Sequence, residues 1–89
     1  MHVIFFGAFR TISNEKMITI KPVPDLKTLF DYLIHLYGVE MKNLLFINGE
    51  LRKDVSILRN GIQIRKEEMF NQTLLEEDTI YFFPAIVGG

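Results

Sequence analysis

Two glycines at the carboxyl end are the residues best suited to chemistry in this 89-residue sequence. Gly88 and Gly89 have no Cβ, so the segment that they end can enter a channel too narrow for side chains. A terminal Gly-Gly could instead be a frayed chain end without a role. Ile86 and Val87 argue against fraying, because disordered tails are typically polar. We therefore predict that residues 84–89 form a flexible tail that carries the function.

Other reactive groups form no recognisable catalytic or metal site in the sequence. There is no cysteine, which excludes a disulfide framework, a thiolate metal site and a cysteine nucleophile. His35 has no second ligand at metal-binding spacing, so a solvated helix surface explains it better than a metal site. The sequence also has no carboxylate dyad at a defined spacing and no Gly-rich phosphate loop. We therefore predict a protein that is not an enzyme and binds no metal or cofactor.

The composition indicates one small domain with its own hydrophobic core. Apolar residues make up 48% of the 89 residues and include eight Phe. Ten basic and eleven acidic residues give a net charge of −1, which favours neither nucleic acid nor a membrane surface as partner. No apolar run approaches the roughly 18 residues of a membrane span, and no signal-peptide pattern opens the chain. We expect a cytoplasmic protein whose single domain covers residues 1–83.

Two apolar runs must position the tail. Residues 1–6 and 80–83 are mostly aliphatic or aromatic, as in strands, and Pro84 ends the second run because it has no N–H to donate. Side chains alternate between the two faces of a strand, so each run has one core face and one outer face. The outer side chains that this alternation predicts are Ile4, Phe6, Tyr81 and Phe83.

One helix follows a second strand at about residues 17–21, and residues 7–16 have the composition of a turn between the two strands. Pro24 suits the first turn of the helix, and Gly38 suits the position just past its end. The helix has a single apolar stripe, formed by Leu26, Leu29, Phe30, Leu33 and Tyr37.

The second half of the chain predicts a hairpin and two less regular segments. Residues 55–59 and 62–65 flank Asn60-Gly61, a pair that suits a type I′ turn. Residues 44–47 are either a short strand or the end of a second helical segment. Residues 66–78 are expected to form a loop or one helical turn, attached to the core by the side chains of Met69, Phe70, Leu74 and Leu75.

These elements predict an α+β domain of the β-grasp (ubiquitin-like) type, with a mixed sheet of four or five strands wrapped around one main helix. In such a sheet the last strand lies parallel beside the first, which explains why both runs are apolar. Ile4, Phe6, Tyr81 and Phe83 would then share the face that the helix leaves uncovered, and we predict that they dock a partner. The alternative is that loops from the middle of the chain cover this face.

The last eight residues, Phe-Phe-Pro-Ala-Ile-Val-Gly-Gly, resemble the C-terminal signature of the ubiquitin-like sulfur carriers of the MoaD/ThiS family, above all the small subunit of molybdopterin synthase. Residues 3–8, 25–33, 55–61 and 75–78 resemble the first strand, helix, hairpin turn and last turn of that family. Two positions depart from it. Ala85 replaces a usual second proline, as in carriers that serve cysteine synthesis, and Arg59 stands where an apolar residue is common.

The resemblance implies that partner enzymes perform the chemistry. A ubiquitin-activating-type adenylating enzyme would use ATP to adenylate the Gly89 carboxylate, and a sulfur donor enzyme would supply the sulfur of a thiocarboxylate. The loaded tail would then enter the large subunit of molybdopterin synthase, in a hetero-oligomer, and donate sulfur to a pterin precursor. The residues that would thread into the partner are Gly88, Val87, Ile86, Ala85 and Pro84.

Two further functions are compatible with the sequence. A sulfur carrier for thiamine, cysteine or tRNA, or a modifier joined to protein lysines, would use the same tail chemistry, so its acceptor must be identified from its partner. A non-covalent β-grasp interaction module would not need Gly88 and Gly89. A truncation that lacks these two residues distinguishes this last function, because binding should survive it.

Overall fold

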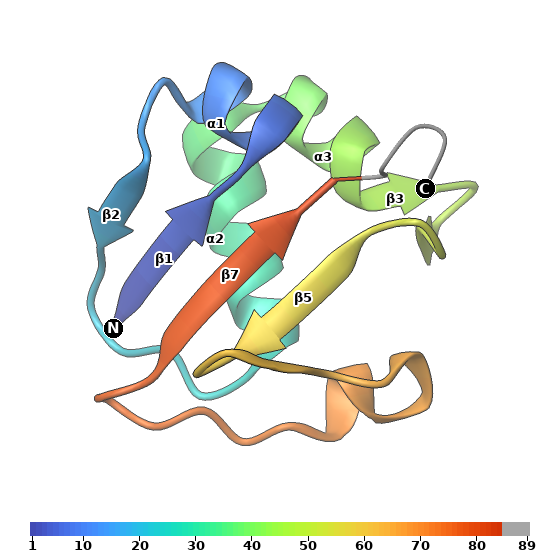
Figure 1. Ribbon diagram of the computed structural model, residues 1–89. Helices are drawn as coiled ribbons and strands as arrows, with labels where there is room; N and C mark the ends of the chain where they lie inside the picture. Colours follow the sequence, from blue (N-terminus) through green and yellow to red (C-terminus); the bar gives the residue numbers. More distant parts are fainter. Residues whose placement is uncertain (85–89) are drawn as a thin grey trace.

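A computed structural model describes residues 1–84 of the protein, in which a sheet packs against helices (Figure 1). The sheet has five strands in the order β2-β1-β7-β5-β6. Among the strands of residues 1–84, β1 and β7 run parallel, and the other neighbouring pairs are antiparallel. With helix α2 (Leu26–Tyr37) packed on one face of this mixed sheet, the arrangement is the β-grasp predicted from the sequence. The strands are β1 (His2–Phe5), β2 (Met17–Thr19), β5 (Ser56–Arg59), β6 (Ile62–Gln63) and β7 (Thr79–Phe83).

The two apolar runs form the centre of the sheet. β1 and β7 pair in register from His2 opposite Thr79 to Phe5 opposite Phe82, and each has another strand on its far side. The predicted inner faces are confirmed, because Val3, Ile80 and Phe82 are fully buried and Phe5 is nearly so. A strand with neighbours on both sides and a covered face must be largely apolar, as these two are.

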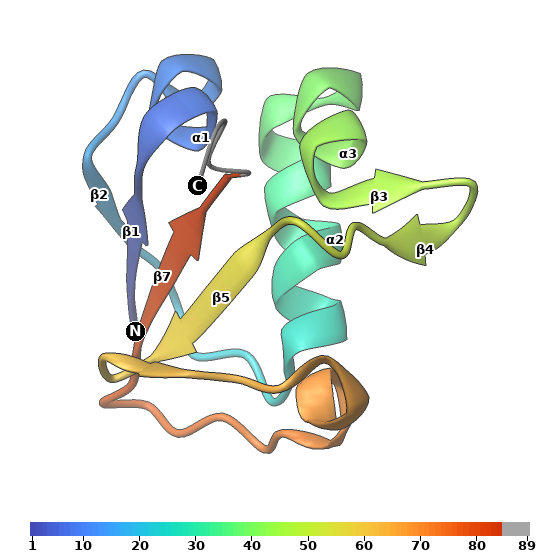
Figure 2. The same cartoon turned by 45° about the vertical axis from the view of Figure 1, so that its right-hand side comes forward.

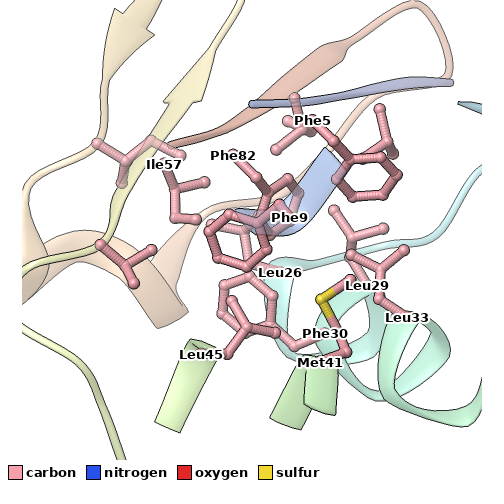
Figure 3. Close-up of a cluster of buried hydrophobic side chains, with 14 of the residues drawn as sticks. Phe5, Phe9, Leu26, Leu29, Phe30, Leu33, Met41, Leu45, Ile57 and Phe82 are labelled. Atoms are coloured by element: carbon pink, nitrogen blue, oxygen red, sulfur yellow. The ribbon is translucent and has the colours of Figure 1, made fainter. Parts of the chain in front are cut away.

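Helix α2 (Leu26–Tyr37) lies across the inner face of the sheet (Figure 2). The Asp25 side chain caps it by accepting a hydrogen bond of 2.8 Å from the Thr28 N–H. Pro24 therefore precedes the cap. The prediction that it lies in the first turn of the helix was wrong. Gly38 follows the helix with φ of +84°, in agreement with its predicted place. The apolar stripe packs on the sheet, where Leu26, Leu29, Phe30 and Leu33 are fully buried beside Phe5 and Phe82 (Figure 3).

The predicted turn between the first two strands is wrong. Residues 7–13 form a short helix, α1 (Gly7–Ser13), which ends at Asn14 in the left-handed conformation. The ring of Phe9 is fully buried, with its centroid 5.5 Å from that of Phe82. Burial of this one aromatic ring attaches a segment of polar composition to the core. The polar composition of residues 7–16 predicted a turn, because composition alone gives no sign that one side chain among polar neighbours is buried.

Residues 44–47, for which the sequence predicted either a short strand or the end of a helix, contain both. Helix α3 (Val39–Leu45) buries Met41 and Leu45, and a small hairpin follows it, formed by β3 (Phe46–Ile47) and β4 (Glu50–Leu51) (Figure 2). Asn48 and Gly49 form its turn, both with positive φ. The β5–β6 hairpin is also confirmed, with positive φ at Asn60 and Gly61 as a type I′ turn requires.

A short 3-10 helix, η1 (Lys66–Asn71), occupies the connection to β7. Two of the four apolar side chains expected to attach this connection, those of Met69 and Leu74, are buried in the core. The other two, Phe70 and Leu75, are half-exposed. The Phe70 ring makes an edge contact with the buried ring of Phe30, at a centroid distance of 6.1 Å.

A buried ion pair fixes the start of β7. The Asp78 side chain is 2% exposed, and its Oδ2 lies 2.9 Å from Arg59 Nη2 in a salt bridge and accepts a hydrogen bond of 2.8 Å from the Leu75 N–H. The Asn60 side chain donates to its other oxygen at 2.8 Å. Burial raises the pKa of Asp78, but these hydrogen bonds outweigh it and hold the pKa below its ordinary value. Arg59, a departure from the family pattern, is thus a structural partner of Asp78.

Candidate functional site

Four outer side chains of β1 and β7 form one surface, which we call the outer patch: Ile4, Phe6, Tyr81 and Phe83. Ile4 and Tyr81 are opposite each other in the pairing of the two strands. The rings of Phe6 and Phe83 are stacked, with centroids 4.1 Å apart and planes only 7° from parallel. Figure 1 looks onto this face of the sheet, with α2 behind it. The structure therefore brings all four predicted docking residues together.

The backbone extends the pairing of β1 and β7 beyond the strands and so creates the stack. The Phe6 N–H donates to the Phe82 carbonyl at 3.0 Å. This hydrogen bond places Phe6 beside Phe83, the residue that follows Phe82. Phe6 is 37% exposed, and the other members of the patch are partly buried. Stacked rings with one apolar surface toward solvent are typical of the aromatic anchors at protein interfaces.

The tail leaves the domain next to this stack. Pro84 directly follows β7 and is half-buried. It lines a small, mainly apolar hollow of about 190 Å³ together with Ala8, Leu44, Arg52, Asp54 and Val55. The other predicted tail residues, Ala85, Ile86, Val87, Gly88 and Gly89, lie outside the described residues. Their threading role, and the role of Gly89 as the reacting group, stay predictions.

An ion pair lies at the rim of this hollow. Arg52 donates from Nε to Asp54 Oδ1 at 3.1 Å and from Nη2 to Oδ2 at 2.9 Å. These hydrogen bonds lower the pKa of the Asp54 carboxyl, which is ionised near neutral pH. A partner approaching the tail exit would therefore meet an apolar surface beside a neutralised pair of charges.

Within residues 1–84, no group of three or more acidic, histidine or cysteine side chains is arranged to hold a metal ion. In the same range, none of the helices has the length and hydropathy needed to cross a membrane. The outer patch consists of one isoleucine, two phenylalanines and one tyrosine, a composition typical of surfaces that bind other proteins. The described part of the site is therefore suited to recognition.

The sequence analysis missed Gly7 as a component of this site. Gly7 follows Phe6, has φ of +54° and packs against the ring of Pro84. A glycine between a predicted strand and a polar segment was the available signal, but it also fits an ordinary turn. Only the parallel pairing of β1 and β7 brings residue 7 next to residue 84.

A protein-family model described as the ThiS family matches residues 3–89 of this chain, the described domain and the tail together. The chain belongs to the ThiS family. This confirms the predicted relationship to the ubiquitin-like sulfur carriers and modifiers. Which acceptor this member of the ThiS family serves stays a prediction.

Individual relatives agree with this assignment. The chain is 29% identical over 87 residues to small archaeal modifier protein 3 of Haloferax volcanii, and the match covers 96% of this chain and 94% of that protein. The solution structure of small archaeal modifier protein 1 from Methanosarcina acetivorans has a TM-score of 0.80 at 24% identity, covering 99% of this chain and 94% of the other. A chain in the crystal structure of the Amycolatopsis orientalis BexX/CysO complex has a TM-score of 0.78 at 21% identity, covering 99% and 98%. These two structures confirm the fold of this ThiS family member.

Proposed function

We propose that this chain is a sulfur carrier whose Gly89 carboxylate is adenylated by a partner enzyme and converted to a thiocarboxylate. One observation carries the proposal. The stacked rings of Phe6 and Phe83 lie at the end of β7, directly before Pro84, so an enzyme docked on them would stand beside the start of the tail. The family match, which extends through Gly88 and Gly89, supports it.

The proposed loading has two steps. A carboxylate oxygen of Gly89 attacks the α-phosphorus of ATP, pyrophosphate leaves, and an acyl-adenylate forms. A hydrosulfide then attacks the carbonyl carbon, and the bond from this carbon to the phosphate oxygen breaks. AMP departs, and the tail now ends in a thiocarboxylate. The carrier supplies the reacting carboxylate and its correct placement, while the partner supplies the groups that stabilise charge. Because loading consumes ATP, we propose that the protein acts in the cytoplasm.

The tail suits this chemistry because its width decreases toward the reacting end. Gly88 and Gly89 add no side chains beside the reacting carbonyl, whereas Ile86 and Val87 offer apolar contacts farther back. Ala85 and Pro84 would occupy the entrance of the partner channel. A bulky side chain at either of the last two positions would block threading, and loss of Gly89 would remove the reacting group from its place.

We propose a pterin precursor as the sulfur acceptor and the large subunit of molybdopterin synthase as the second partner. The run Phe82-Phe83-Pro84 that leads to the diglycine supports this acceptor, through its resemblance to the small subunit of that synthase. The identity with small archaeal modifier protein 3 favours a second candidate, a modifier of protein lysines. In that reaction a lysine amine would attack the adenylate and release AMP, leaving an isopeptide bond.

The first test is the intact mass of the protein after incubation with an adenylating enzyme, ATP and hydrosulfide. We expect replacement of one oxygen by sulfur. Because oxidation of a methionine adds almost the same mass and the chain has four Met, fragmentation must place the change on Gly89. A truncation that lacks only Gly89 is the matched control, and it should fold normally and remain unloaded.

Two results would contradict the proposal. One is normal loading of the truncation. The other is an unchanged mass of the full chain while a control carrier loads in parallel, which would favour a non-covalent binding module. Two incubations distinguish the acceptors. The loaded protein with a molybdopterin synthase large subunit and pterin precursor should yield a dithiolene product if the first candidate holds. The unloaded protein with the adenylating enzyme, ATP and a cell extract should yield lysine conjugates if the second candidate holds.

A further inference from the structure

Gly7 and Pro84 are the residues at which β1 and β7 leave the sheet on the same side. The paired positions run in order from Phe5 opposite Phe82 to the stacked rings of Phe6 and Phe83. Gly7 and Pro84 are the next pair in the same register. Pro84 has no N–H, so backbone pairing cannot continue through it, and its contact with residue 7 depends on shape alone.

The space between these two residues is too small for a side chain at position 7. A Cβ on Gly7 would lie 2.6 Å from Pro84 Cγ and 3.2 Å from Pro84 Cδ. The proline ring cannot rotate away, because it is closed onto its own backbone nitrogen. Any side chain at position 7 would therefore displace the Pro84 ring together with the chain that continues from it.

The other described glycines with positive φ do not have this constraint. Gly38, Gly49 and Gly61 also have positive φ, but a Cβ added to any of them would meet no atom within 4 Å. Positive φ explains the use of glycine at those turns. At Gly7 a second requirement, contact with Pro84, is added to the same backbone requirement.

We propose that Gly7 is a positioning residue for the tail. Its missing side chain lets the Pro84 ring lie directly against the backbone at the end of β1, and this contact sets the direction in which the chain leaves the domain beside the outer patch. The consequence for loading rests on the function proposed above, since only a threaded tail needs a set direction. Gly7 would act through Pro84 on the reaction of a carboxylate five residues farther along the chain.

The test is a double-mutant cycle between Gly7→Ala and Pro84→Ala. The second change removes Cγ and Cδ, the two atoms that the new Cβ would strike, and leaves Pro84 Cβ at an ordinary distance of 4.0 Å. Gly61→Ala is the matched control, because it places Ala at a comparable positive φ, +86°, in open space. Comparison with this control separates backbone strain from the contact with Pro84.

Two readouts are needed, one of geometry and one of function. In the first, NMR of the free protein should show nuclear Overhauser effects between the Gly7 α-protons and the Pro84 ring, and Gly7→Ala should move the Pro84 resonances whereas Gly61→Ala should not. In the second, pyrophosphate exchange by the adenylating enzyme should give a kcat/KM that falls by roughly 10- to 100-fold in Gly7→Ala, since misplaced reacting groups cost rates of this order. The double variant should recover to within about threefold of Pro84→Ala alone, because the clash is gone.

Equal kcat/KM for Gly7→Ala and Gly61→Ala would overturn the proposal, as would a double variant that is no better than Gly7→Ala. In either case the contact with Pro84 would not control the tail. If the adenylating enzyme does not act on the natural sequence at all, the proposed function fails, and with it the consequence for loading. The NMR comparison still decides the positioning itself: unchanged Pro84 resonances in Gly7→Ala would refute it.

Discussion

Phe82 and Phe83 are adjacent in the sequence but face opposite sides of the sheet, so replacing each by alanine should give opposite results. Phe82 is fully buried, and its ring centroid lies 5.9 Å from that of Phe5, 5.5 Å from Phe9 and 5.9 Å from Phe30. Removing a ring in such a place costs transfer free energy and leaves a cavity. We expect Phe82→Ala to lower the free energy of unfolding by about 3–5 kcal/mol.

Phe83→Ala should destabilise the fold much less. Its ring is partly exposed, and its aromatic contact is the stack with Phe6. Such a pair contributes roughly 0.5–1.5 kcal/mol beyond area burial. Half of the 1.5–3 kcal/mol for burying a whole Phe adds about 1 kcal/mol, so a total loss of about 1.5–2.5 kcal/mol is expected. Small domains have only about 5–15 kcal/mol of stability, and the two variants should differ clearly.

Docking should show the reverse order for the variants that fold. As an anchor of the outer patch, Phe83 should contribute at least about 2 kcal/mol to binding, so Phe83→Ala should raise the Kd for the adenylating enzyme by about 30-fold. Phe70→Ala is the matched control, because Phe70 is also a half-exposed aromatic residue but lies on η1, outside the outer patch. It should leave this Kd unchanged.

Urea unfolding followed by circular dichroism measures the stability of each variant, and titration calorimetry measures the Kd. The reasoning is refuted if Phe83→Ala lowers the unfolding midpoint as much as Phe82→Ala, because Phe83 would then belong to the core. It is also refuted if Phe83→Ala and Phe70→Ala bind the enzyme equally well, because the outer patch would then not be the docking surface.

Arg59→Met should leave the buried Asp78 carboxylate without its ion-pair partner and lower the free energy of unfolding by roughly 1–3 kcal/mol. Arg65→Met, which breaks the exposed pair with Glu67, should lower the free energy of unfolding far less, because solvent screens that pair, and equal losses in urea unfolding would count against a structural role of Arg59. Because the pKa of Asp78 is lowered by folding, its contribution is complete above the unfolded pKa of about 3.9 and is lost as the pH falls through the lower folded value. The urea midpoint of the natural sequence should therefore fall as the pH drops through this acid range, and the midpoint of Asp78→Asn should fall less steeply. Parallel plots of midpoint against pH for the two proteins would show that other groups control stability in acid.

Most of the fold could be predicted from local patterns. The alternation in residues 1–6 and 80–83 predicted both inner and outer faces, and Asn60-Gly61 predicted a hairpin. These predictions succeeded because strand periodicity and turn conformation depend on neighbouring residues. Helix α1 could not be predicted in this way, because the ring of Phe9 is buried against Phe82, which lies 73 residues later in the sequence.

The residues of the candidate site could also be predicted in part from local patterns. The sequence by itself determined that Gly88 and Gly89 follow an apolar segment, and that Ile4, Phe6, Tyr81 and Phe83 lie on outer faces of two strands. It could not determine that Phe6 and Phe83 stack.

Only the tertiary structure decided which outer residues meet. The parallel register of β1 and β7 joins positions that are 77 residues apart, and it brings Phe6 to Phe83 and Gly7 to Pro84. No local pattern encodes such a register, because it is selected by the packing of both strands on α2. The same register gives Gly7 its second constraint, which the sequence alone presents as an ordinary turn glycine.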